Sequence, residues 1–122
     1  MGRRLWPMER VHPAVRETVE RRFEGTIAEV EAAIAAHQVV VIGMGLNPHP
    51  LRARRMLGAA GIEHHYLSYG SYLSQWRRRT ALKMWIGWHT FPMVFVRGDF
   101  IGGANDLQRL LASGELSASS PR

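Results

Sequence analysis

The chain has 122 residues, of which 46% are hydrophobic, and a formal charge of +6 from 16 Lys and Arg against 10 Asp and Glu. A chain of this size folds as one domain around one core. It contains no cysteine, which excludes disulfides, thiolate metal sites and thiol redox chemistry. Its longest apolar runs are too short to cross a bilayer, and no apolar run follows the first arginines. We therefore expect a soluble cytoplasmic protein without a membrane anchor.

Most of the excess positive charge lies in two arginine clusters, one at residues 52–55 and one at residues 77–79. Such clusters favour anionic ligands. A nucleic-acid interface needs basic residues on one face, interleaved with exposed aromatic side chains, within a recognisable module. The pattern indicates no such module, and a solvated basic helix face is the commoner explanation.

The N-terminal part of the chain predicts two helices. Apolar residues recur at helical spacing from Val15 to Phe23, after a proline suited to a first helical turn. Gly25 interrupts this pattern, and Thr26 followed by Glu29 resembles a capping box that starts a second helix. We therefore expect an N-terminal helical extension at residues 1–25.

A buried strand followed by a helix is predicted next. Residues 38–42 form a β-branched run without polar interruption, which is typical of a strand buried on both faces. Pro48 and Pro50 suit the first turn of a helix, which Gly61 closes. Residues 62–69 predict a second strand. Because a helix connects the two strands, they are expected to be parallel.

The rest of the chain predicts a helix at 72–86, a hairpin of strands 93–96 and 100–101, and a last helix at 104–112. Arg97-Gly98-Asp99 matches an adhesion tripeptide, but here it supplies the permissive centre of the hairpin turn. Residues 117–122 predict a flexible tail. The fold class is therefore α/β, with a four-stranded mixed sheet flanked by helices and an extra N-terminal helix.

From about Thr26 to Leu116 the chain resembles the glutaredoxin family of the thioredoxin superfamily. The resemblance is carried by Lys83 near a helix end, the loop WHTFP at 88–92, the run VFVRGDFIGG at 94–103 and the closing LASGEL at 111–116. The loop is similar to that of the monothiol branch. The resemblance implies a three-layer, thioredoxin-like domain at residues 26–116.

The resemblance also places Asn47 and Pro50 at the positions of the family's active-site cysteines, in the segment VVVIGMGLNPHP, and Met44 where the family usually has a lysine. Without a thiolate, no mixed disulfide with glutathione forms and no iron-sulfur cluster is held. Thiol reductase activity is therefore not expected. From the residues alone, Asn47 is expected to cap the helix that follows it.

With thiol chemistry excluded, the activity that the resemblance still implies is non-covalent recognition of glutathione. The residues it implies are Arg79, Lys83, Thr90, Phe91, Pro92, Gly103, Ala104, Asn105 and Asp106. Phe91 and Pro92 would offer a backbone edge through a cis peptide bond, and Lys83 with Arg79 would face the glycine carboxylate. The last helix's N-terminus would receive the γ-glutamyl end. The family's usual Cys-Asp pair there is Ala104-Asn105, with Asp106 adjacent.

Two functions of different classes follow. The first is a cysteine-less, redox-inactive glutaredoxin-like protein that binds glutathione or a glutathionylated partner. The alternative is an interaction or scaffold module with a decayed glutathione groove, whose basic helix faces contact an acidic macromolecule. Catalysis of another kind lacks a nucleophile and base that the pattern brings together.

Histidine and tryptophan residues have simpler explanations than a cofactor site. His64 and His65 are neighbours on a strand and point to opposite faces, which does not suit a shared metal. His49 and His89 are expected near each other, but two ligands without a third predict no metal site. Of the tryptophans at 76, 85 and 88, at least two are expected to pack between helix and sheet.

Overall fold

The computed structural model describes residues 3–21, 24–71 and 74–118. Its centre is a four-stranded sheet with the order β2-β1-β3-β4. The strands are β1 (Val39–Gly43), β2 (His65–Ser68), β3 (Met93–Val96) and β4 (Asp99–Gly102). β1 is parallel to β2 and antiparallel to β3, and β3 is antiparallel to β4. The predicted mixed sheet is therefore confirmed.

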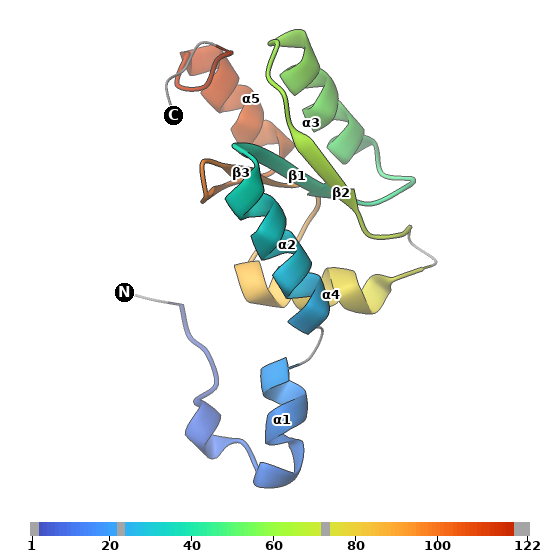
Figure 1. Ribbon diagram of the computed structural model, residues 1–122, viewed down its shortest axis with the longest axis vertical. Coiled ribbons are helices and arrows are strands. Elements are labelled where there is room, and N and C mark those ends of the chain that lie inside the picture. Colours follow the sequence, from blue (N-terminus) through green and yellow to red (C-terminus); the bar gives the residue numbers. More distant parts are fainter. Residues whose placement is uncertain (1–2, 22–23, 72–73, 119–122) are drawn as a thin grey trace.

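Helices cover both faces of the sheet (Figure 1). They are α2 (Glu24–Ala36), α3 (Pro48–Ala59), α4 (Trp76–Ile86) and α5 (Ala104–Ser113). α2 and α4 share one core cluster with the sheet, and α3 and α5 share the other. The three-layer arrangement expected from the sequence is therefore present.

β1 is the strand that both cores share. All five of its residues are buried. Successive side chains of a strand point to opposite faces, so Val40 and Ile42 enter the core under α2 and α4, while Val39 and Val41 enter the core under α3 and α5. The uninterrupted β-branched run is what allows one strand to supply both cores.

The hairpin turn forms at Arg97 and Gly98, whose φ angles are +52° and +86°. Positive φ at both central residues is the geometry of the tight turns that match strand twist. Arg97-Gly98-Asp99 therefore has the structural role expected of it.

Several element boundaries differ from the predicted ones. α2 begins at Glu24, so Gly25 and the buried Thr26 lie inside the helix and the predicted capping box at Thr26 is wrong. The cause is that a glycine in a first turn costs too little to stop a helix whose apolar face is buried. β2 is shorter than residues 62–69, and α4 begins at Trp76.

The N-terminal region contains a short 3-10 helix, η1 (Met8–Arg10), and the predicted extra helix, α1 (Pro13–Arg21). Both lie beyond the start of α2, away from the sheet (Figure 1). Three parts of the sequence predictions lie outside the described residues. They are the end of the first helical pattern at Phe23, the start of a helix at residue 72, and residues 119–122 of the tail. Within the described residues, no helix combines the length and apolarity needed to span a bilayer.

We predict that Gly43→Ala destabilises the fold. A Cβ at Gly43 would lie 2.6 Å from the Pro50 Cβ and 2.6 Å from the Tyr66 Oη, an overlap that typically costs about 1–3 kcal/mol. Gly58→Ala is the matched control, because its Cβ meets nothing within 4 Å. Urea unfolding should show a loss for the first variant only. Equal stability of wild type and Gly43→Ala would contradict the close packing at the end of β1.

Candidate functional site

The residues singled out by the sequence come from the start of α3, from α4, from the loop before β3 and from the start of α5. Asn47 is the N-cap of α3, and its Oδ1 accepts a hydrogen bond from the His49 amide at 2.9 Å. The predicted capping role is therefore confirmed. Pro50 is buried in the first turn, packed toward Gly43. An amide oxygen used in this way supplies no nucleophile.

Lys83 lies beside the loop that precedes β3. Its Nζ is 5.6 Å from the centroid of the Phe91 ring, within range of a cation–π contact. The Phe91–Pro92 peptide bond is cis, and both residues are buried, whereas Thr90 is exposed. The ion pair found within the described ranges joins Arg109 to Asp106, so Lys83 has no carboxylate partner there.

Arg79 has a different environment from Lys83. Only 7% of the residue is exposed, and its Nη1 donates to the Tyr69 carbonyl at 2.9 Å and to the Ser74 carbonyl. The guanidinium therefore holds the segment after β2 against α4. This differs from the expected role of Arg79, which was to share an anion with Lys83, because a buried cation takes the carbonyl partners nearest to it.

Tyr69 extends this network to α2. Its hydroxyl donates to the Glu29 carboxylate. Burial raises the pKa of Tyr69 well above its usual range, and the hydrogen bond to the Glu29 carboxylate adds to the effect. The network therefore ties α2, the segment after β2 and α4 together on one side of the sheet.

The first turn of α5 contains Asp106, whose Oδ2 accepts a hydrogen bond from the Gly103 amide at 2.9 Å. Its Oδ1 pairs with Arg109 Nη2 at 2.8 Å. The Gly103 hydrogen bond, more than the ion pair, lowers the pKa of Asp106. Ala104 is buried and Asn105 is exposed, and the first amides of a helix have no intrahelical acceptor. The helix start therefore offers amide donors, while the Asp106 carboxylate is already engaged.

Arg52 is a site residue that the sequence did not single out individually. Its Nη2 donates to Asn105 Oδ1 at 2.7 Å and its Nη1 to Gln108 Oε1 at 3.4 Å. The arginine therefore connects α3 to the start of α5 and positions the Asn105 amide. The sequence showed Arg52 only as part of a basic cluster, and no local pattern marks a contact across 53 positions of the chain.

Trp88 closes the inner side of the site. Its indole ring meets Phe100 edge-on at 5.3 Å, and its Nε1 is buried without a hydrogen-bond partner among the described residues. A Cβ at Gly103 would lie 3.7 Å from this nitrogen and 3.5 Å from the Pro92 carbonyl.

Trp85 also packs on the core, whereas Trp76 is 56% exposed. The expectation that two of the three tryptophans pack inside is therefore confirmed.

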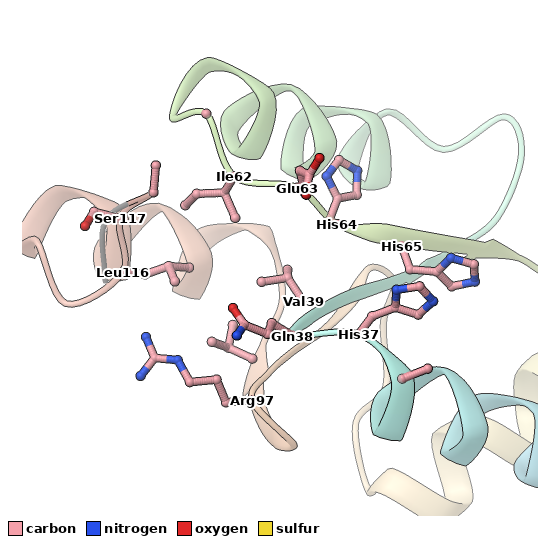
Figure 2. A pocket seen from close by; sticks show the side chains of 14 residues that line it. His37, Gln38, Val39, Ile62, Glu63, His64, His65, Arg97, Leu116 and Ser117 are labelled. Carbon is pink, nitrogen blue, oxygen red and sulfur yellow. The ribbon is translucent and has the colours of Figure 1, made fainter. Parts of the chain in front are cut away.

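A cavity of about 950 Å³ lies at the opposite end of the sheet, where β1 and β2 begin. Figure 2 shows the rings of His37 and His65 stacked there, with centroids 4.2 Å apart. His64 contacts α3 instead, through Arg54 at 3.3 Å, and burial lowers its pKa. No cluster of three or more metal-binding side chains occurs in the ranges the structure covers.

Comparison with known proteins finds relatives in sequence and solved structures with a similar fold. No family model matches the chain. A "Glutaredoxin-like protein" of Dictyostelium discoideum is 46% identical over 90 residues, covering 74% of this chain and 73% of that protein. A wheat glutaredoxin crystal structure superposes with a TM-score of 0.68 at 25% identity, covering 78% of this chain and 91% of its own. A buckwheat glutaredoxin–glutathione complex shares the fold, with a TM-score of 0.70 at 20% identity, covering 80% and 88%.

We predict that Asp106→Asn removes a pH-dependent part of the stability. Because the folded pKa is lowered, the stabilisation is complete above the unfolded pKa of about 4 and is lost as the pH falls through the folded value. Unfolding at pH 7 should show a loss of about 1 kcal/mol or less, as for other exposed helix-start interactions. The difference should shrink progressively as the pH falls below about 4. Asp99→Asn, on the exposed hairpin, is the control, and a pH-independent difference for Asp106→Asn would contradict the assignment.

Proposed function

The chain belongs to the glutaredoxin family and has its thioredoxin-like fold, and from this premise we propose that it is a redox-inactive member that binds glutathione non-covalently. The ligand is free glutathione or the glutathione of a modified partner protein. The proposal rests on one arrangement, the Lys83 ammonium held beside the Phe91–Pro92 loop without a carboxylate partner among the described residues.

Glutathione carries two carboxylates, and the chain offers a different donor for each. Lys83 supplies a cation for the glycine carboxylate, and a charge-assisted hydrogen bond is stronger than a neutral one. The free amides of Ala104 and Asn105 supply donors for the γ-glutamyl carboxylate, since helix starts attract anions. Thr90, Phe91 and the Pro92 carbonyl line the space between these two ends in the proposed pose.

The ammonium of the γ-glutamyl group is the less favoured end of the ligand. Asp106 would have to leave the Gly103 amide or Arg109 in order to meet it. Arg79 adds no second cation, because Tyr69 and Ser74 take its hydrogen bonds. We therefore propose weak, millimolar-range binding that depends mainly on the carboxylates.

Redox turnover is absent from this proposal for a chemical reason. Thiol-disulfide exchange requires a thiolate that attacks a disulfide sulfur, and the chain has no cysteine. The Asn47 side chain caps α3 instead. An iron-sulfur cluster does not fit either, because its usual ligands are cysteine thiolates. Within the proposal, glutathione is a bound ligand and not a reductant.

The second candidate is an interaction module that contacts an acidic macromolecule. One surface favours it: the outer face of α3 has a depression of about 470 Å³ lined by Pro48, Leu51 and Met56, with Arg52 and Arg55 beside it. Apolar contact area flanked by arginines suits an acidic amphipathic partner. The internal bonds of Arg79 and Asp106 also favour this candidate.

Amide-resolved NMR titration with reduced glutathione tests the proposal. Shifts should cluster at Phe91, Gly103, Ala104 and Asn105. Lys83→Ala should weaken the affinity about tenfold, as expected for one charge-assisted hydrogen bond. Arg78→Ala is the matched control, because it removes an exposed cation from the same helix. Absence of shifts at millimolar glutathione would reject this function in favour of the interaction module.

A separate assay tests the absence of redox turnover. The purified chain should reduce a mixed disulfide between glutathione and a small thiol no faster than a heat-denatured sample does. Activity above that control, in protein shown by mass spectrometry to be free of contaminating glutaredoxin, would contradict the redox-inactive assignment.

A further inference from the structure

The N-terminal arm, residues 3–10, exposes two large apolar side chains. Leu5 is 71% exposed and Trp6 is 69% exposed. Figure 1 shows that the arm runs outside the sheet and its covering helices, below the end of α4. Large exposed apolar side chains that lie next to each other mark interaction sites more often than chance.

The arm is braced at both ends. Arg3 Nη2 donates to the Met84 and Trp85 carbonyls, at 3.2 and 3.0 Å, and so caps the C-terminal end of α4. At the other end, Trp6 Nε1 donates to the Arg10 carbonyl at 3.1 Å, and the Arg10 guanidinium lies 5.8 Å from the Trp6 ring centroid. These contacts hold Leu5 and Trp6 out in solvent.

A groove of about 680 Å³ lies between α2, the end of α4 and the β3–β4 hairpin. We name it the hairpin groove. Its large apolar lining residues are Ile34, Trp85, Ile86, Phe95 and Phe100. Two oppositely charged residues also line it, Glu31 on α2 and Arg97 at the hairpin turn.

The charged residues of the arm that do not brace it are complementary to those that line the hairpin groove. The arm has four charged residues, of which Arg3 donates to α4 and Arg10 lies over the Trp6 ring. The other two are Arg4, which precedes Leu5 and Trp6, and Glu9, which follows them. The groove is lined by Glu31 from α2, by apolar side chains, and by Arg97 from the hairpin turn. Complementary charges of this kind fix the register of an association, while apolar burial supplies most of its free energy.

We propose that the hairpin groove binds the N-terminal arm of a second copy of this chain. The arm of the same copy is disfavoured, because moving Leu5 and Trp6 into the groove of their own copy would break the Arg3 hydrogen bonds to α4. Each copy has one arm and one groove, so two copies related by a twofold axis satisfy both reciprocally. The result is a homodimer of moderate affinity, because the contact is small.

This dimer is independent of the proposed glutathione site. The hairpin groove borders the start of β1 and the tip of the hairpin, whereas Lys83, Pro92 and Gly103 lie toward the opposite end of those strands. Two ligand-binding sites would therefore remain open in the assembled dimer.

Sedimentation velocity of the full chain over a wide concentration range tests the proposal. The wild type should pass from monomer to dimer as its concentration rises. Trp6→Ala should raise the dissociation constant about tenfold or more, as expected for a buried tryptophan anchor. Trp76→Ala, which removes an exposed tryptophan from the start of α4, should leave it unchanged. A wild type that stays monomeric, or an equal effect of both variants, would overturn the proposal.

A charge exchange separates this contact from unspecific apolar association. Arg4→Glu and Glu31→Arg should each weaken the dimer several-fold, because each places like charges together. The double variant should recover affinity toward that of the wild type, since it restores an opposite pair. Additive losses in the double variant would overturn the assigned register and with it the docking of the arm in this groove.

Discussion

Because all of β1 is buried on both faces, the rest of the domain must supply two apolar layers to cover it. α2 and α4 close one side and α3 and α5 close the other. The strand's neighbours are fixed at the same time, since β2 pairs with it in parallel and β3 in antiparallel register. The carboxyl end of β1, the loop before β3 and the start of α5 are thereby brought to one end of the sheet.

That end holds the residues of the proposed glutathione site, and it has no cysteine. Where the thiol chemistry would begin, Asn47 serves the helix as a cap and Pro50 packs into the interior. The elements that need no sulfur are still there: an ammonium beside the cis-proline loop and a helix start with unsatisfied amides. Without cysteine the chain cannot carry out thiol-disulfide exchange, and the proposed binding of an anionic peptide depends only on these two sulfur-free elements.

The fold was largely predictable from the sequence, because its strongest signals are local. The β-branched run of β1, the prolines at the start of α3 and the glycine of the hairpin turn each act within a few residues. The start of α2 was mispredicted at Thr26 because burial of the helix outweighs the local stop signal of Gly25. The role of Arg79 was also different from the expected one, since its partners Tyr69 and Ser74 are set by tertiary packing.

Contacts between distant residues explain what sequence reasoning missed at the site. The bond from Arg52 to Asn105 joins two helices, and the stacking of His37 on His65 joins a helix end to an edge strand. No spacing rule relates such pairs. The resemblance to glutaredoxins supplied most of the candidate site, and the structure then distinguished Lys83, which has no carboxylate partner among the described residues, from Arg79 and Asp106, which are engaged.

The proposed glutathione site lies beside Asn47, the position at which the resemblance places the family's nucleophile. The most direct measurement restores that nucleophile: Asn47→Cys is exposed to oxidised glutathione, and the protein–glutathione disulfide is followed by intact-mass spectrometry as glutathione thiolate leaves. We predict that Asn47→Cys forms the adduct faster than Leu51→Cys, a variant with its cysteine at an exposed position of α3. Adding Lys83→Ala to Asn47→Cys should slow the reaction. Equal rates at the two positions, with no effect of Lys83→Ala, would contradict the retained glutathione site.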